Sequence, residues 1–252
     1  MNLLKVYINK VLSLLGYSVK KNKKISILEN ILIAHNYFLS KKINEFEDDP
    51  FINYIKKNFQ FSNSSLLQDL FALWVNNNIN DGFFVEFGAG NGVDFSNTFL
   101  LEKRGWNGLL IEPSSNFDNC KKSRLVQSLN FAVTSKSNQT LFFYEALDKN
   151  FSTLNPTKNA IKKKVLTITL SDALQFVNAP RYINFLSIDV EGREFDALLG
   201  IDFNKYFVKC LVVEHNFNLL NRKKIYELLV DNNFKRVYEN QTLYDDWYIN
   251  EK

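Results

Sequence analysis

The chain has 252 residues, of which 46% are hydrophobic and 23% charged, which is the balance of a soluble globular protein. Its formal net charge of +4 comes from residues 1–80, which hold 10 lysines and 6 acids, whereas residues 81–252 hold 21 basic and 21 acidic residues. No apolar run reaches the roughly 18 residues that span a membrane, and Cys120 and Cys210 match no metal or redox spacing. The basic residues lack the pattern of a nucleic-acid groove. We therefore expect a cytoplasmic protein that binds no nucleic acid.

Residues 1–80 are predicted to form a helical N-terminal extension. Apolar residues recur at helical spacing in 25–39 and 66–75. Residues 1–24 carry six lysines and no acid among regularly spaced apolar residues. This pattern suits a peripheral contact with the anionic inner face of a membrane, and equally a helix packed on the domain with its lysines in water.

From residue 83 short apolar runs alternate with helical stretches, and we treat residues 81–252 as the second domain. Strands are expected at 83–87, 108–112, 128–133, 182–189 and 209–215, helices at 95–105, 115–122, 169–177, 194–200 and 222–230, and a closing hairpin at 234–239 and 243–249. Residues 134–164 form an excursion. Strand–helix alternation predicts an α/β fold with a mostly parallel, doubly wound sheet covered on both faces.

A glycine loop follows the first predicted strand in the stretch FFVEFGAGNG. Gly88, Gly90 and Gly92 allow a tight turn and let a ligand approach the backbone at the carboxyl end of the strand, where such sheets bind ligands. Glu86, just before the loop, suits the ammonium and sulfonium groups of S-adenosylmethionine better than the pyrophosphate of a dinucleotide. A simple tight turn is the alternative.

Glu112 ends the next apolar run, LLIEP. A carboxylate there can accept hydrogen bonds from both ribose hydroxyls, a role common to dinucleotide and adenosylmethionine folds. The alternative is a surface carboxylate at a strand end.

Several motifs in this order resemble the FkbM family of S-adenosylmethionine-dependent methyltransferases across residues 82–250. They are VEFGAGNGVDFSNTFLLEKRGWNGLLIEPS, FLSIDVEGREFDALLG, VVEHNF and DDWYI. The resemblance implies a class I methyltransferase fold, Rossmann-like, with a seven-stranded sheet whose last strand is antiparallel. It also implies O-methylation, often of sugar hydroxyls in glycans. The family loop usually reads G-A-N-D-G, so Asn91 supplies no acid at that position here.

The resemblance also implies a set of cofactor contacts around the first three strands. These are Glu86, Gly88, Gly90 and Asn91 at the methionine part, Ser96 and Asn97 in support of that loop, Glu112 at the ribose, and Phe131 and Ala132 beside the adenine.

The acceptor site is expected at the ends of the fourth and fifth strands. Asp189 ends its strand and is predicted to lie near both the cofactor and the methyl group, and Glu191 follows two residues later. A hydroxyl is a poor nucleophile without a base, and His215 is the first choice because histidine titrates near neutral pH. Helix capping by the two acids and a packed, structural His215 are the alternatives.

Asp189, Glu191 and Glu214 could also bind Mg²⁺ through their oxygens, although the sequence contains no dedicated metal motif. The tail Asp245 to Tyr248 suits either a carbohydrate contact or a packed closing strand. We therefore predict an O-methyltransferase that acts on a sugar hydroxyl of a glycan or glycan precursor, as in surface polysaccharide biosynthesis. An NAD-type Rossmann oxidoreductase and a non-catalytic partner in a glycan assembly complex are the alternatives.

Overall fold

The computed structural model describes residues 49–146, 152–156 and 159–252. The helix expected at 25–39 and the basic segment 1–24 lie outside these residues.

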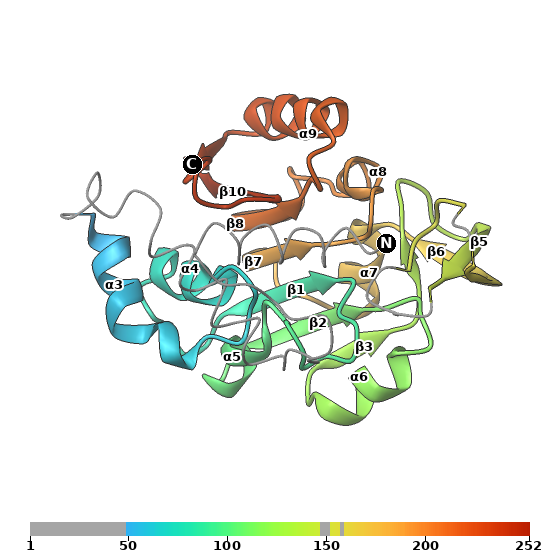
Figure 1. The fold of residues 1–252 in the computed structure, drawn as a ribbon, viewed down its shortest axis with the longest axis horizontal. Coiled ribbons are helices and arrows are strands. Elements are labelled where there is room, and N and C mark those ends of the chain that lie inside the picture. The colour runs from blue at the N-terminus through green and yellow to red at the C-terminus, as the bar shows by residue number, and fades with distance from the viewer. Residues whose placement is uncertain (1–48, 147–151, 157–158) are drawn as a thin grey trace, which may run out of the picture.

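A seven-stranded sheet forms the centre of the molecule (Figure 1). Its strands are β1 (Phe83–Phe87), β2 (Asn107–Ile111), β3 (Gln127–Leu129), β7 (Tyr182–Ile188), β8 (Phe207–Glu214), β9 (Phe234–Val237) and β10 (Asp245–Asn250). The spatial order is β3-β2-β1-β7-β8-β10-β9, and β10 runs antiparallel to both of its neighbours. The predicted fold, with its antiparallel last strand, is confirmed.

Helices cover both faces of the sheet because alternate side chains of each strand point to opposite sides. On one face lie α3 (Pro50–Asn58), α4 (Gln68–Val75), α5 (Phe99–Lys103) and α6 (Phe117–Ser123), with the short 3₁₀ helix η2 (Phe59–Phe61) between α3 and α4. On the other lie α7 (Leu170–Phe176), α8 (Glu194–Leu198) and α9 (Leu219–Asp231). We refer to these as the α4 face and the α9 face.

A second sheet of three strands lies at one end of the main sheet (Figure 1). It consists of β4 (Ala132–Val133), β5 (Thr140–Glu145) and β6 (Ile161–Ile168) in the order β4-β6-β5. The single strand predicted at 128–133 is therefore wrong. The chain leaves the main sheet after Leu129, where the Asn130 side chain donates to the carbonyl of Glu112, and then enters the second sheet.

Side-chain caps begin three of the α-helices in the described part of the chain. Thr169 caps α7 by accepting a hydrogen bond from the amide of Asp172. Asn218 caps α9, which begins three residues earlier than expected. The helix predicted at 95–105 is shorter, because residues 96–98 bond to Glu86 instead. Among the described residues, no helix has the length and apolar character needed to cross a membrane.

Helix α4 belongs to the core of the main sheet. Phe71 of α4 is fully buried and stacks on Trp247 of β10, with 4.7 Å between the ring centroids. Trp247 is thus a packed residue of a closing strand and has no exposed ring to offer a sugar. The division into residues 1–80 and 81–252 stays a prediction, but the described part of the extension packs directly on the sheet.

Candidate active site

Five carboxylates gather at the carboxyl edge of the sheet, on its α4 face. Successive side chains of a strand point to opposite faces, so residues an even number of positions apart share a face. Each of the five lies an even number of positions from a side chain packed against the α4 face. They are Glu86 on β1, Glu112 after β2, Asp189 after β7, Glu214 on β8 and Asp245 at the start of β10. Asp245 is directly opposite Glu214 in the antiparallel register. This edge, where the strand order reverses between β1 and β7, is where open α/β sheets bind ligands.

Glu86 faces the protein rather than a ligand. It accepts hydrogen bonds from the hydroxyls of Ser96 and Thr98, at 2.8 and 2.6 Å, and from the amide of Asn97 at 2.7 Å. Burial raises the pKa of this carboxyl, although the Arg124 charge opposes the shift. Glu86 thus shapes the segment that follows the glycine loop, and its direct contact with the cofactor stays a prediction.

Arg124, which follows α6, is a central residue that the sequence analysis missed. Its side chain is fully buried and bonds to Glu102 at 2.7 Å, to the carbonyl of Gly92 at 2.8 Å, and to the hydroxyls of Ser96 and Thr98. A Nη1 atom also lies 3.7 Å from Glu86. Arg124 thus fastens the end of the glycine loop to the carboxylate behind it. A lone arginine after a predicted helix gave no signal of this role.

The glycine loop makes the close approaches that its residues allow. Gly88 has a φ of +70°, and a Cβ there would lie 1.8 Å from the carbonyl oxygen of Asp189. Gly92 has a φ of +82°, and a Cβ there would lie 2.8 Å from the Cγ of Arg124. The loop can therefore pass between the end of β7 and Arg124 only without side chains at these two positions.

Glu112 is buried and holds the glycine loop with one oxygen. Its Oε2 accepts from the amide of Gly90 and its Oε1 from the amide of Ser114, both at 2.7 Å. Burial raises the pKa of this carboxyl, and these hydrogen bonds oppose the shift. The side chain of Ser114 is a further donor to this carboxylate, whose two oxygens offer about four lone-pair sites in all. Glu112 can therefore hold the loop and still accept from a ligand hydroxyl.

Asn97 has a buried side-chain oxygen with no partner. Its Nδ2 donates to Ser187 at 2.9 Å, and its Oδ1 bonds to nothing among the described residues. Asp189 has a similarly buried and unpaired Oδ1. Buried acceptors without donors are rare in folded proteins, so these two suit a donor brought by a ligand.

The other predicted cofactor residues occupy supporting positions. The side chain of Asn91 is turned into its own loop, where it accepts from the amides of Val93 and Asp94. Phe131 and Ala132 follow β3 beside the Asn130 side chain, which donates to the carbonyl of Glu112. Their predicted place beside an adenine ring fits this neighbourhood and stays a prediction.

Three carboxylates form a cluster at the ends of β7 and β8. One oxygen from each of Asp189, Glu191 and Glu214 lies within 4.8 Å of the others. Burial raises the pKa of Asp189 to about 7, and a hydrogen bond from Glu214 opposes the shift. Burial and the Asp189 charge raise the pKa of Glu214 well above its usual range. Near neutral pH the pair therefore holds a proton, Glu214 favours its neutral form, and Asp189 is able to accept a proton.

His215 does not join this cluster, because it follows Glu214 directly and so points to the α9 face. Its Nδ1 accepts from the amide of Phe217 at 3.0 Å, and its Nε2 lies 4.0 Å from Asp246, a residue that Arg222 also binds. The side chain is 3% exposed, and burial lowers its pKa. Its Nε2 is buried and without a hydrogen-bond partner among the described residues, and its role as general base stays a prediction. His215 shapes the turn between β8 and α9.

Comparison with known proteins agrees with this architecture. The model of the Methyltransferase FkbM domain matches residues 86–239, which is more than half of the chain. The chain belongs to the FkbM methyltransferase family. The FkbM match begins at Glu86 and includes the glycine loop, Glu112 and the carboxylate cluster. A search of curated proteins gave no match.

Solved structures show distant likenesses to this FkbM chain. The methyltransferase FkbM from Methylobacillus flagellatus KT is 12% identical, with a TM-score of 0.46, covering 99% of this chain and 71% of that one. A candidate caffeoyl-CoA O-methyltransferase from Staphylococcus aureus is 11% identical, with a TM-score of 0.45, covering 85% of this chain and 99% of that one. A fibrillarin/Nop5p complex is 10% identical, with a TM-score of 0.40, covering 68% and 73%. The family assignment rests on the domain match alone.

Proposed function

We propose that this FkbM methyltransferase transfers the methyl group of S-adenosylmethionine to a hydroxyl of a carbohydrate, in a glycan or a glycan precursor. One observation carries the proposal. Glu112, with acceptor capacity left beside the glycine loop, and the Asp189 cluster lie on the same face and the same edge of the sheet. Their positions on either side of β1, where the two halves of the sheet meet, support a ribose-binding role for Glu112 and a proton-accepting role for Asp189.

The residues at this edge fit S-adenosylmethionine. Glu112 is suited to its ribose hydroxyls, and the unpaired oxygens of Asn97 and Asp189 are suited to its ammonium and to the positive charge beside the methyl group. The same oxygens would repel the pyrophosphate of NAD. When bound, S-adenosylmethionine supplies a methyl group on a sulfonium, which leaves as a neutral thioether.

Asp189 takes the role of proton acceptor in this proposal. Its Oδ1 has no donor in the part of the chain that the structure describes, and Glu214 beside it favours the neutral form, so an acceptor hydroxyl can bond to Asp189 and give up its proton. Glu191, half-buried at the open side of the cluster, is placed to accept from a second hydroxyl. This edge would favour a sugar because its carboxylates can accept hydrogen bonds from neighbouring hydroxyls.

A divalent cation at Asp189, Glu191 and Glu214 stays a separate prediction. The donors are oxygens, as Mg²⁺ prefers, and they lie close enough to share one ion. A cation there would orient two hydroxyls and lower their pKa. If methyl transfer survives chelation by EDTA, Asp189 accepts the proton without the help of a cation. If EDTA abolishes methyl transfer and added Mg²⁺ restores it, a cation at these three residues takes part in the reaction.

Two measurements test the proposal in sequence. Thermal unfolding with S-adenosylmethionine, compared with NAD, tests the cofactor, because only a ligand of the folded state raises the melting temperature. Mass spectrometry of the host's surface polysaccharide, with and without this protein, then tests the acceptor. We expect S-adenosylmethionine, and not NAD, to raise the melting temperature. We also expect a sugar of the polysaccharide made without this protein to lack the mass of one CH₂ group. A shift with NAD alone, or an unchanged polysaccharide, would contradict it.

A further inference from the structure

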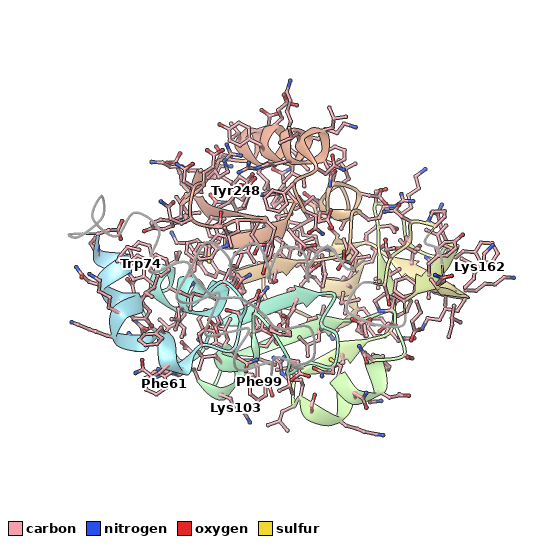
Figure 2. All side chains as sticks on the ribbon, viewed as in Figure 1. Phe61, Trp74, Phe99, Lys103, Lys162 and Tyr248 are labelled. Atoms are coloured by element: carbon pink, nitrogen blue, oxygen red, sulfur yellow. The ribbon has the colours of Figure 1, made fainter. Side chains whose placement is uncertain are left out.

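The ribbon formed by β5 and β6 has one face that the proposed reaction does not use. Register pairs Thr140 with Leu166, Phe142 with Lys164, and Tyr144 with Lys162, and because pairs alternate between faces these six side chains share one side. We call it the ribbon face. Lys162 lies at the end of the molecule that the ribbon forms (Figure 2).

The ribbon face combines exposed apolar and basic groups. Phe142 is 48% exposed and Leu166 is 53% exposed, and Lys162 and Lys164 are exposed beside them. The Lys162 ammonium lies 3.7 Å from the centroid of the Phe142 ring. Neither strand places an acid on this side.

The opposite face of the ribbon is more covered, apart from Ile161 at the start of β6, which is 69% exposed. Phe143 is 4% exposed there, and Glu145, the one acid of the two strands, is buried and paired with Lys163 at 2.8 Å. Lysines alone would serve to protect an edge strand from pairing with other chains. That role does not account for a half-exposed phenylalanine and leucine between them.

We propose that the ribbon face docks this protein on the surface of an anionic lipid membrane. Phosphate headgroups complement the two lysines, and the boundary of the acyl chains takes up Phe142 and Leu166, as in proteins that lie on a membrane. A soluble anion would satisfy the lysines and leave both apolar side chains in water. The apolar exposure therefore favours the membrane over a free phosphate.

The ribbon is connected to the active site, so docking of the ribbon would also position the active site. Tyr144 pairs through its backbone with Thr153, whose hydroxyl donates to the carbonyl of Glu191 at 2.8 Å. The docked ribbon would hold the carboxyl edge beside the membrane, where a lipid-linked acceptor is presented. This consequence rests on the proposed function, but the docking itself needs neither cofactor nor methyl transfer.

Flotation with vesicles tests the docking on the full chain. The wild type is expected to float with vesicles of phosphatidylcholine mixed with phosphatidylglycerol, less so at high salt, and not with phosphatidylcholine alone. The double substitution Lys162→Glu and Lys164→Glu should weaken binding about tenfold or more, since each lysine contributes attraction to the anionic surface. Phe142→Ser with Leu166→Ser should weaken it as well.

Matched controls place the same changes elsewhere on the surface. Lys223→Glu with Lys235→Glu, and Phe176→Ser with Val230→Ser, alter exposed residues outside the ribbon and should float like the wild type. The indole introduced by Phe142→Trp should be quenched by brominated lipids. The proposal is overturned if the wild type does not float, if ribbon variants float as well as the controls, or if only the lysine pair matters and inorganic phosphate competes fully.

Discussion

At the residue scale, the site depends on which face of a strand each acid occupies. Adjacent residues of a strand point to opposite faces, so Glu214 joins the carboxylate cluster and His215, one position on, does not. The sequence supplied both residues and their strand, and counting by two from the buried Val212 would have separated them. Residue type favoured histidine as the base, whereas the geometry of the cluster favours Asp189.

Asp189→Asn tests the proposed proton acceptor. The amide keeps the shape of the side chain and cannot take a proton, so we expect methyl transfer to fall by about 100-fold or more. Binding of S-adenosylhomocysteine, which lacks the positive charge beside the methyl group, should change by only a few fold when measured by calorimetry. His215→Gln should retain most of the activity, as should Asp118→Asn on the exposed side of α6. A greater loss in His215→Gln than in Asp189→Asn would restore the histidine as base.

Glu112→Gln tests the ribose contact. The loss of a charged acceptor should raise the dissociation constant for S-adenosylhomocysteine about tenfold or more, because hydrogen bonds to charged groups contribute about 1.5–3 kcal/mol. The turnover of bound substrate should change little. Glu227→Gln, at an exposed position of α9, is the control. Equal affinities for all three proteins would remove Glu112 from the site.

Asp245→Asn tests whether ionisation of this buried acid, close to other acids, lowers the stability of the fold. Burial, and then the charges of Asp189 and Asp246, raise the pKa of Asp245 to about 8, although a bond from Gln68 opposes the shift. Between about pH 4 and that value, the folded protein keeps a proton that the unfolded chain releases, so the free energy of unfolding falls as pH rises.

The Asp245→Asn variant should therefore be more stable than the wild type at pH 8, by about 1 kcal/mol or more, with little difference near pH 4. Urea unfolding at both pH values measures this. A variant that is less stable at pH 8 would show that the ionised form of Asp245 is needed by the fold.

At the element scale, short helices are held by buried polar contacts as well as by apolar packing. Helix α5 is shorter than the sequence pattern indicated, since the residues before it bond to Glu86 and Arg124. The single predicted strand at 128–133 is divided because Asn130 bonds back to β2. Apolar periodicity carries no information about either contact.

Arg124→Met tests the link between α6 and the glycine loop. Removing the guanidinium leaves Glu86 and Glu102 as buried acids without a cation, so the free energy of unfolding should fall by about 3–5 kcal/mol. Adding Glu86→Gln should recover part of the loss, which a double-mutant cycle in urea would measure. Strictly additive effects would show that the two residues do not interact.

Phe71→Ala tests whether α4 belongs to the core of the methyltransferase fold. Its ring is fully buried against Trp247, so truncation should cost about 3–5 kcal/mol of stability. Phe61→Ala removes a ring that is 55% exposed in the neighbouring 3₁₀ helix and should change stability by less than about 0.5 kcal/mol. Similar effects of the two changes would separate α4 from the core.

At the scale of the whole molecule, strand–helix alternation and the motif order were enough to predict the main sheet and its antiparallel last strand. The second sheet was not predicted, because β5 and β6 carry lysines and aromatics with no clear burial pattern. In the site, Glu112 and Asp189 lie at the carboxyl edge of the sheet as expected, and their roles toward a nucleoside and an acceptor stay predictions. Arg124 and Asp245 emerge only from contacts between distant segments.

The measurement that tests the central claim most directly is the structure of this protein bound to S-adenosylhomocysteine. The account predicts both ribose hydroxyls on the Glu112 carboxylate, the amino acid part against the loop from Gly88 to Gly90, and the sulfur turned toward Asp189. A nucleoside bound at another edge of the sheet, or one whose ribose leaves Glu112 untouched, would contradict it.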